Sequence, residues 1–418
     1  MNVLIYGNTN NYLLLLAEGL RALGHEATLI INRTELLHRP EGIDSQYSRY
    51  PEWILDWSHV TYEDLMYGSR FVEQSLAELS EVSDFALLND TGPSLHQNIA
   101  CPFAVLATGS DVTWYANRAS QASYFSKSAT RFLYSARGKA QRKKFRAFVE
   151  RQRQGIRKAG LVFSPPHAIA PELSAILDNI GVPRRRRHFL YLADTHRLSP
   201  EPVPAGAILK ILCGARVTMA ASDSDNIASQ DDKGTAILLA GIKKFCEQGH
   251  SADLHMPEKG SDVEETKELI HELDLTSVVT WYKEASHAEF YAKIKSAHVI
   301  VDSVGRSFPG LCYTAAIASG RCVLANLYPN KIPFDLPGLH ADRPEEVAAG
   351  LIKLDNDRQY LQAISTASGY FAESQLSPKK QAQDVLRLLQ PALKRRKSLK
   401  AVYKWGGEWL KRFQKIKW

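Results

Sequence analysis

The chain has 418 residues, of which 44% are hydrophobic and 23% are charged, with a net charge of +7. This composition excludes wholesale disorder, and the length exceeds what one hydrophobic core normally serves, so we expect two globular domains. No run of about eighteen apolar residues is present, which excludes a membrane-spanning helix. The first residues also lack the basic and small-residue features of a signal peptide.

The first thirty residues predict a strand, a helix and a second strand. Asn2–Tyr6 and Ala27–Ile31 are short continuous apolar runs, as expected for parallel strands buried on both faces. Between them we expect a helix over Asn11–Leu23, with Asn10 as its N-cap and Gly24 as its C-terminal stop. Further strands are expected at Phe85–Leu88, Ala104–Leu106 and Leu161–Ser164.

The second half alternates strands and helices more regularly, which predicts a parallel, doubly wound sheet with helices on both faces. Strands are expected at Ile208–Leu212, Ala252–Met256, Ser277–Trp281, His298–Asp302 and Arg321–Ala325, with helices over about 234–248, 262–273, 286–296 and 310–319. The proline- and arginine-rich segment Pro183–Pro204 is the predicted interdomain linker. We therefore divide the chain into a domain over 1–195, a domain over 205–375, a returning helix over 376–393 and a basic tail over 394–418.

Positive charge is concentrated in two segments. Residues 127–160 hold twelve Lys or Arg and one Glu, and residues 394–418 hold ten and one, so the rest of the chain is acidic. Apolar residues lie at helical spacing in the first segment (Phe145, Phe148, Val149 and Ile156), and aromatic residues are interleaved in the second (Tyr403, Trp405, Trp409, Phe413 and Trp418). This pattern favours an anionic membrane surface. Nucleic acid and a merely solvated chain end are the weaker alternatives, and we expect no nucleic-acid partner.

Five cysteines are scattered without any C-x-x-C pairing: Cys101, Cys213, Cys246, Cys312 and Cys322. We expect them to be reduced core residues of an intracellular protein rather than metal ligands or disulfides. Asp223-Ser224-Asp225 has the D-x-D form of a metal site, but it lies in a polar insertion rather than after a strand. We therefore expect no metal.

The first strand-to-helix turn is Gly7-Asn8-Thr9-Asn10, without the G-x-G-x-x-G pattern of a dinucleotide site, which disfavours hydride chemistry with NAD. Gly7 nevertheless precedes a helix N-terminus that would face the cleft between the domains. We include Gly7 among the candidate ligand contacts, with an ordinary tight turn as the alternative.

Two basic residues of the second half, Arg216 and Lys233, are expected to lie close together. One predicted strand ends in Gly214-Ala215-Arg216, and Lys233-Gly234-Thr235 opens the following helix. Arg216 and Lys233 can converge on one point in the cleft, where with a helix dipole they would stabilise a leaving diphosphate without a metal. An ordinary solvated lysine is the alternative for Lys233.

A third group follows the strand that ends at Asp302. The glycine-containing loop from Gly305 to Gly310 would present backbone N–H groups to phosphate oxygens at a helix start. The candidate donor-binding residues here are Gly305, Arg306, Ser307, Phe308, Pro309, Gly310, Leu311 and Thr314, together with Gly7 and Gly214.

These motifs together resemble the retaining GT-B glycosyltransferases of the GT4 group over roughly residues 1–380. The resemblance is carried by Arg216, Lys233-Gly234, the run Ala316-Ile317-Ala318-Ser319-Gly320-Arg321-Cys322-Val323, and Ala107-Thr108-Gly109-Ser110-Asp111. It implies an α/β fold of two Rossmann-like domains that face a cleft, a nucleotide-sugar donor bound by the second domain, and an acceptor bound by the first. The chain departs from the family where two glutamates of the donor loop are replaced by Ser307 and Ala315, so that Ser307, Tyr313 or Thr314 would have to contact the nucleotide differently.

The resemblance further implies a front-face substitution in which the leaving phosphate helps to deprotonate the acceptor. Asp111, His96 and His167 are first-half polar groups near predicted strand ends, and Asp111 joins Arg216 and Lys233 as a catalytic candidate. We expect a metal-independent glycosyltransferase without a cofactor. Its donor would be a nucleoside-diphosphate sugar, with UDP the commonest choice, and its acceptor a lipid-linked or surface-polysaccharide glycan at the cytoplasmic face of the inner membrane. The alternative is a noncatalytic GT-B-like protein that acts in membrane-bound assembly or sensing.

Overall fold

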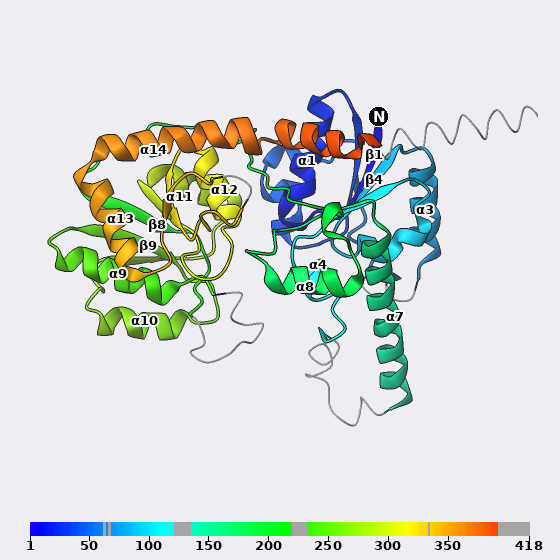
Figure 1. Cartoon of the computed structure of the whole chain (residues 1–418), viewed down its shortest axis with the longest axis horizontal. Helices are drawn as coiled ribbons and strands as arrows, with labels where there is room; N and C mark the ends of the chain where they lie inside the picture. The colour runs from blue at the N-terminus through cyan, green and yellow to red at the C-terminus, as the bar shows by residue number, and fades with distance from the viewer. Residues whose placement is uncertain (62–63, 66–67, 121–134, 220–231, 333–334, 392–418) are drawn as a thin grey trace, which may run out of the picture.

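The computed structural model describes residues 1–61, 64–65, 68–120, 135–219, 232–332 and 335–391. The basic tail over 394–418 and the D-x-D sequence Asp223-Ser224-Asp225 lie outside the described residues. Two parallel sheets with flanking helices follow each other along the chain (Figure 1).

The first sheet has seven described strands, all parallel, because each connection between them crosses over through helices or loops. Their order across the sheet is β3 (Ile54–Asp56), β2 (Glu26–Ile31), β1 (Asn2–Tyr6), β4 (Phe85–Leu88), β5 (Phe103–Leu106), β6 (Leu161–Phe163) and β7 (Arg187–His188). The flanking helices include α1 (Tyr12–Ala22), α3 (Arg70–Glu81), α4 (Ser110–Thr113), α7 (Ala136–Lys158) and α8 (Pro171–Ile180).

Successive side chains of the central strands pack on opposite faces of this sheet. Val3 and Ile5 of β1 belong to one hydrophobic cluster, while Leu4 and Tyr6 belong to another. Both clusters are buried, which explains why β1 is a continuous apolar run instead of an alternating one.

The second sheet has six described strands, again all parallel. Their order is β10 (Val279–Tyr282), β9 (Ala252–Pro257), β8 (Leu209–Cys213), β11 (Val299–Val301), β12 (Cys322–Ala325) and β13 (Leu339–His340). The helices are α9 (Thr235–Glu247), α10 (Val263–Glu272), α11 (His287–Ser296), α12 (Leu311–Ala318), α13 (Pro344–Asn356) and α14 (Arg358–Phe371). Two buried clusters, one on each face, form its core.

Three strands were missing from the sequence-based assignment, namely β3, β7 and β13, each only two or three residues long. Because β7 belongs to the first sheet, the expected linker over Pro183–Pro204 overlaps that sheet at its start. The N-cap assignment for Asn10 is wrong. The carboxamide Oδ1 of Asn8 accepts the N–H of Leu14 at 2.9 Å instead, while Asn10 and Asn11 adopt left-handed conformations that asparagine tolerates.

After α14 the chain returns to the first domain. A helix over residues 378–391 contributes Ala382, Val385 and Leu389 to the core that contains β1 and α1 (Figure 1). Gly19 of α1 packs against this helix so closely that a Cβ atom there would lie 2.1 Å from the carbonyl oxygen of Pro378. The two sheets are therefore joined twice, by the connection over 189–208 and by this returning helix.

The apolar residues that suggested a membrane-binding face in 127–160 are buried inside the protein. Phe145, Phe148 and Val149 of α7 pack with Tyr115, and Ile156 packs in the core of the first sheet. The interpretation of these four residues as a lipid-facing stripe is wrong. Helical spacing of apolar residues indicates a buried face, but it does not show whether lipid or protein buries that face. Among the described residues, no helix is long and apolar enough to cross a membrane.

An ionic network holds the connection between the sheets against the first domain. Arg197 donates to Glu18 of α1 at 2.6 Å and to Asp44 at 2.9 Å, and Tyr47 donates to Glu18 at 2.6 Å. Burial opposes the ionisation of Glu18, but hydrogen bonds from His196 and Arg197 outweigh it and lower the pKa of Glu18 from 4.5 to about 2.

We therefore expect Glu18→Gln to lower the free energy of unfolding by about 3 kcal/mol at pH 7. Because folding lowers the pKa of Glu18, its stabilisation is present above the unfolded value and is lost as the pH falls from about 4.5 to about 2. Urea unfolding over this range should show the difference between wild type and variant shrinking with acidity. The control is Glu26→Gln, since that carboxylate is 74% exposed in its pair with Arg21 and should matter little. A difference that does not change with pH would contradict this assignment.

Candidate functional site

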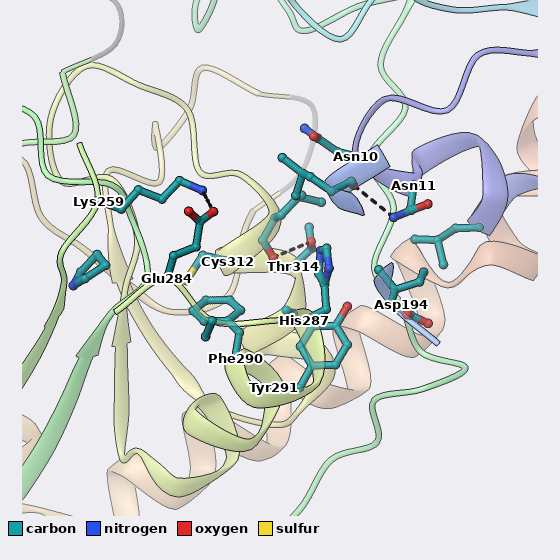
Figure 2. Close-up of a pocket in the computed structure, with 18 of the residues that line it drawn as sticks. Asn10, Asn11, Asp194, Lys259, Glu284, His287, Phe290, Tyr291, Cys312 and Thr314 are labelled. Carbon is teal, nitrogen blue, oxygen red and sulfur yellow. Dashed lines mark hydrogen bonds and ion pairs between the residues drawn. The ribbon is translucent and has the colours of Figure 1, made fainter. Parts of the chain in front are cut away.

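The points where strand order reverses in the two sheets face a common cavity. The order turns between β1 and β4 in the first sheet and between β8 and β11 in the second, and ligands of such sheets bind at these positions beyond the carboxyl ends of the strands. A cavity of about 230 Å³, here called the cleft cavity, is lined by Asn10 and Asn11 after β1 and by Gly214 after β8 (Figure 2).

The start of α12 forms one wall of the cleft cavity. Leu311, Cys312, Thr314 and Ala315 line it, all from the first five residues of this helix. Gly214 is required opposite, because a Cβ atom there would lie 2.0 Å from the Sγ atom of Cys312. The positive end of the α12 dipole and its first N–H groups therefore border the space in which a ligand would lie.

Charged groups reach the cleft cavity from the ends of two neighbouring strands. Lys259 follows β9 and Glu284 follows β10, and their side chains form an ion pair at the rim (Figure 2). Asp194, from the connection between the sheets, lines the other side. Burial raises the pKa of Asp194, although Arg197 opposes this shift.

His287 links the two domains across the cleft. Its Nδ1 lies 2.9 Å from the carbonyl oxygen of Gly42, in the short turn Pro40–Gly42 of the first domain. Burial lowers the pKa of His287, so the ring is neutral at pH 7. Because a carbonyl oxygen only accepts, Nδ1 carries the proton and Nε2 is left as an acceptor.

A carboxylate of the protein itself occupies part of the α12 N-terminus. Oδ2 of Asp302 accepts the N–H groups of Gly310 at 2.8 Å and of Tyr313 at 2.9 Å. Burial raises the pKa of Asp302, while the charge of Lys233 and these backbone N–H groups oppose the shift. Among the first-turn donors of α12, Asp302 leaves the N–H groups of Leu311 and Cys312 for a ligand.

The predicted cations lie on segments that run side by side. The N–H of Lys233 donates to Thr218 Oγ1 at 3.1 Å, which places the start of α9 next to the segment that follows Arg216. Arg216 is exposed and Lys233 is half-buried, with Asp302 as a charged neighbour. Neither side chain lines the cleft cavity as the protein stands.

The β11–α12 loop, residues 302–310, carries most of the predicted donor-binding residues and packs against the segment that leads into α9. Gly305 packs on Gly234, and the N–H of Ser307 donates to the carbonyl of Asp232 at 3.1 Å. Gly305, Arg306, Ser307, Phe308, Pro309 and Gly310 do not line the cleft cavity, whereas Gly214, Leu311 and Thr314 do. The loop therefore positions α12 and Lys233 by packing.

Aromatic side chains connect the same loop to the connection between the sheets. The ring of Phe308 lies 5.7 Å from Phe189 and 5.3 Å from Tyr191. The hydroxyl of Tyr191 donates to the carbonyl of Pro309 at 2.8 Å. Movement of one domain relative to the other would thus be transmitted directly to the start of α12.

Three first-half candidates have structural roles. The carboxylate of Asp111 is 1% exposed and accepts the backbone N–H groups of Thr108 at 2.9 Å and Gly109 at 2.8 Å. Burial raises the pKa of Asp111 to about 7, against these hydrogen bonds. Asp111 does not line the cleft cavity, and its catalytic assignment stays a prediction.

Gly7 and His96 are also buried. Gly7 has a positive φ of 86°, and a Cβ atom there would lie 2.8 Å from the carbonyl oxygen of Asn89, so glycine is needed for close packing between β1 and β4. His96 lies 5% exposed, with Nδ1 3.2 Å from the carbonyl oxygen of Pro93. Neither residue lines the cleft cavity.

Several cavity residues were missed by the sequence analysis, among them Asn10, Lys259, Glu284 and His287. Lys259 and Glu284 come two residues after β9 and β10, so the rule that selected Gly214 would have selected them as well. All five cysteines are free, as expected, and four of them are buried, yet Cys312 also lines the cleft cavity.

One group of described residues has the spacing of a metal site, namely His340, Asp342 and Glu346 at the start of α13. Arg343 already forms ion pairs with Asp342 and Glu346, and none of these residues lines the cleft cavity. We assign this group no role in the site.

No protein-family model and no curated protein sequence matches the chain. Solved structures match over nearly its whole length. A sucrose-phosphate synthase from Thermosynechococcus elongatus aligns with a TM-score of 0.58 at 13% identity, covering 94% of this chain and 99% of that one. A glycosyltransferase from Rickettsia africae aligns with a TM-score of 0.58 at 16% identity, covering 94% and 98%. A lipopolysaccharide outer core galactosyltransferase in its apo form aligns with a TM-score of 0.53 at 10% identity, covering 94% and 100%.

These proteins are GT-B glycosyltransferases, so the chain has the two-domain GT-B fold that the motif pattern predicted. Identities of this size show a shared architecture and say nothing of the chemistry.

Proposed function

We propose that the protein is a glycosyltransferase that transfers a sugar from a nucleoside diphosphate to an acceptor held by the first domain. The observation that carries this proposal is the cleft cavity, which lies at the switch points of both sheets and is bordered by the first turn of α12. A cavity between two doubly wound domains, with Lys259, Glu284 and Asp194 among its lining residues and a helix N-terminus on one wall, suits a sugar joined to phosphate.

The chemistry requires stabilisation of the diphosphate that leaves as the glycosidic bond breaks. The N–H groups of Leu311 and Cys312 and the dipole of α12 supply part of it. Lys233, whose charge acts on the carboxylate of Asp302, would supply a full charge. Arg216 is exposed on the neighbouring segment and would join them when the cleft closes on a ligand. This set of groups needs no metal. The retaining, front-face course that the family resemblance implies is part of the proposal.

Glu284 is a carboxylate suited to the ribose of the donor. The position that carries a glutamate in the resembled family is Ala315, which lines the cleft cavity but offers no hydrogen-bonding side chain. Glu284 lines the same cavity, and a carboxylate can accept both hydroxyls of a ribose. We propose that Glu284 binds the ribose of the donor. Its ion pair with Lys259 would then break when the donor binds.

The acceptor side of the proposal is a lipid-linked or surface-polysaccharide glycan at a membrane. Its support is the positive charge of residues 127–160 and 394–418, of which the described part of α7 presents exposed cations such as Arg137, Lys139 and Lys143. Deletion of 394–418 should move the protein from vesicles of anionic lipid to the supernatant in a flotation assay. Unchanged partitioning would show that residues 394–418 do not bind the membrane.

The direct test of the function is sugar transfer. Thermal unfolding with UDP, GDP, ADP and CMP should identify one nucleotide that raises the melting temperature by mass action. The corresponding nucleotide sugars, with radiolabel in the sugar, should then label a component of a membrane extract. If no nucleotide stabilises the protein and no nucleotide sugar is consumed, the proposal fails.

A second candidate is a noncatalytic protein with the same fold. It is favoured by Asp302, because a carboxylate that accepts the N–H groups of Gly310 and Tyr313 competes with a phosphate for the α12 N-terminus. The two candidates differ in what happens when that charge is removed.

Asp302→Asn separates the two. The amide oxygen of asparagine can accept the same two N–H groups that Oδ2 accepts, so the loop is kept while the charge is lost. For a transferase we expect UDP, or the nucleotide found above, to bind about tenfold more tightly at pH 8, equivalent to about 1.4 kcal/mol. The gain should shrink at lower pH, where Asp302 becomes protonated and neutral in the wild type. Isothermal titration calorimetry would measure it, and a variant that still binds no nucleotide favours the noncatalytic candidate.

A further inference from the structure

A second cavity lies on the first domain where two of its strands end. It has a volume of about 410 Å³ and is here called the basic cavity. Residues 164–167, which directly follow β6, line it together with His188 and Phe189 at the end of β7. Ser174 of α8 also lines it, and α8 lies on the side of the first domain that faces the second (Figure 1).

The titratable side chains that line the basic cavity are all arginine or histidine. Arg184, Arg187, His167 and His188 line it, and no carboxylate belongs to the described residues of its lining. Arg184 and His167 are exposed, while Arg187 and His188 are partly buried. Burial lowers the pKa of His188, and an anion bound nearby would raise it again. A cavity of this composition selects an anionic ligand.

Arg187 is held in place with one donor left over. Its Nη1 donates to Ser174 Oγ at 3.1 Å, and its Nη2 donates to Asp178 Oδ1 at 2.6 Å. Nη2 also donates to the carbonyl of Val182 at 2.5 Å. The Nε atom is buried and has no hydrogen-bond partner among the described residues. A buried guanidinium N–H without a partner is costly, and its preferred partner is the oxygen of a phosphate or carboxylate.

The four consecutive arginines of this segment have different roles. Arg186 donates to the carbonyls of Arg157 and Ala159 at the end of α7. Its guanidinium therefore has a structural role, as do most of the N–H donors of Arg187. Arg184 lines the basic cavity, whereas its neighbour Arg185 is exposed and does not. Arg184 therefore places a positive charge at the cavity, and Arg185 is a matched control with a positive charge outside it.

The basic cavity adjoins the loop that starts α12. Phe189 lines the cavity, and its ring lies 5.7 Å from that of Phe308. Tyr191, stacked on Phe189 at 5.5 Å, donates to the carbonyl of Pro309. A group bound in the basic cavity would thus lie on the acceptor side of the cleft, next to the element that borders the proposed sugar donor.

We propose that the basic cavity binds a phosphate group carried by the sugar acceptor. Arg184 supplies the long-range charge, and the guanidinium of Arg187, held in place by Ser174 and Asp178, supplies a fixed charge at the cavity wall. The assignment of this phosphate to a sugar acceptor rests on the proposed glycosyltransferase function, whereas phosphate binding by the cavity does not. Free inorganic phosphate offers the same chemistry, so the experiment has to separate the two sources.

The first arm measures phosphate binding to the full chain. Inorganic phosphate is titrated by calorimetry at about 0.15 M ionic strength, where charges more than about 8 Å apart are largely screened. UDP, or the nucleotide that stabilises best, is present at saturation to fill the cleft cavity. We expect Arg184→Glu to weaken phosphate binding at least tenfold and Arg185→Glu to weaken it less than twofold. Equal effects in the two variants, or no effect of Arg184→Glu, would overturn the proposal.

The second arm identifies the source of the phosphate. Phosphatidylcholine vesicles carry either a polyprenyl phosphate or the corresponding polyprenol, with phosphatidylglycerol added to match their surface charge so that the basic tail binds both equally, and binding is measured by flotation. We expect a preference for the phosphate that Arg184→Glu abolishes and Arg185→Glu keeps. Phosphate binding in the first arm without this preference would overturn the acceptor assignment.

Nucleotide affinity serves as the independent readout. Both variants should bind the nucleotide as the wild type does, because neither arginine lines the cleft cavity. A wild-type protein that binds no nucleotide would refute the proposed function. The phosphate titration would then be made without nucleotide and would still test the basic cavity.

Discussion

Replacing Lys233 with alanine should reduce kcat/KM for sugar transfer by about 10²–10³, the effect of removing one preorganised charge from a developing anion. Lys233 is half-buried at the start of α9, next to Asp302 and the first turn of α12. Without it, the charge of Asp302 would face the leaving diphosphate unopposed. Steady-state kinetics with the nucleotide sugar identified in the panel would measure the loss.

The matched control for this prediction is Lys243→Ala on the same helix, where the lysine pairs with Glu247 at 3.9 Å. Its activity should stay close to that of the wild type. The double variant Lys233→Ala with Asp302→Asn should regain part of the nucleotide affinity but not the turnover. An active Lys233→Ala protein would remove Lys233 from the mechanism.

Replacing Gly305 with alanine should destabilise the second domain by about 1–3 kcal/mol, as forced overpacking does. A Cβ atom at Gly305 would lie 2.6 Å from the backbone nitrogen of Gly234 and 2.7 Å from the carbonyl oxygen of Asp232. Both contacts are to backbone, which cannot move aside as a flexible side chain can. Because Lys233 lies between these residues, nucleotide affinity should fall together with the melting temperature.

Gly310→Ala provides the contrast within the same loop. Nothing lies within 4 Å of a Cβ atom at this position. We expect its melting temperature to match the wild type. Equal losses for the two glycines would show that the loop is not held by the packing of Gly305 on Gly234.

The fold was predictable where the sequence carries long apolar runs. Asn2–Tyr6 and Phe85–Leu88 were located to the residue, since a strand buried on both faces leaves no polar interruption. The strands β3, β7 and β13 were not predictable, because each is two or three residues long and only partly buried, unlike the equally short but fully buried β11. The apolar stripe of α7 shows the other limit, in that it specifies a buried face but not the partner that buries it.

The candidate site was predictable where a motif fixes the backbone. Gly214, Leu311 and Thr314 line the cleft cavity as expected, because strand ends and helix starts determine their positions. Asp111 was predicted to be catalytic and Gly7 to contact a ligand, yet both are buried, because polar or glycine residues after a strand serve packing as well as function. The contact of His287 with Gly42 depends on two segments 245 residues apart, which no local pattern can show.

The most direct test of the account is a crystal structure of the protein with the nucleoside diphosphate that stabilises it most. We predict the two phosphates at the first turn of α12, against the N–H groups of Leu311 and Cys312, with the ammonium of Lys233 on the same oxygens. The ribose should lie within hydrogen-bonding distance of Glu284. A nucleotide bound outside the cleft cavity, or phosphates that avoid the α12 N-terminus because Asp302 holds it, would contradict the central claim.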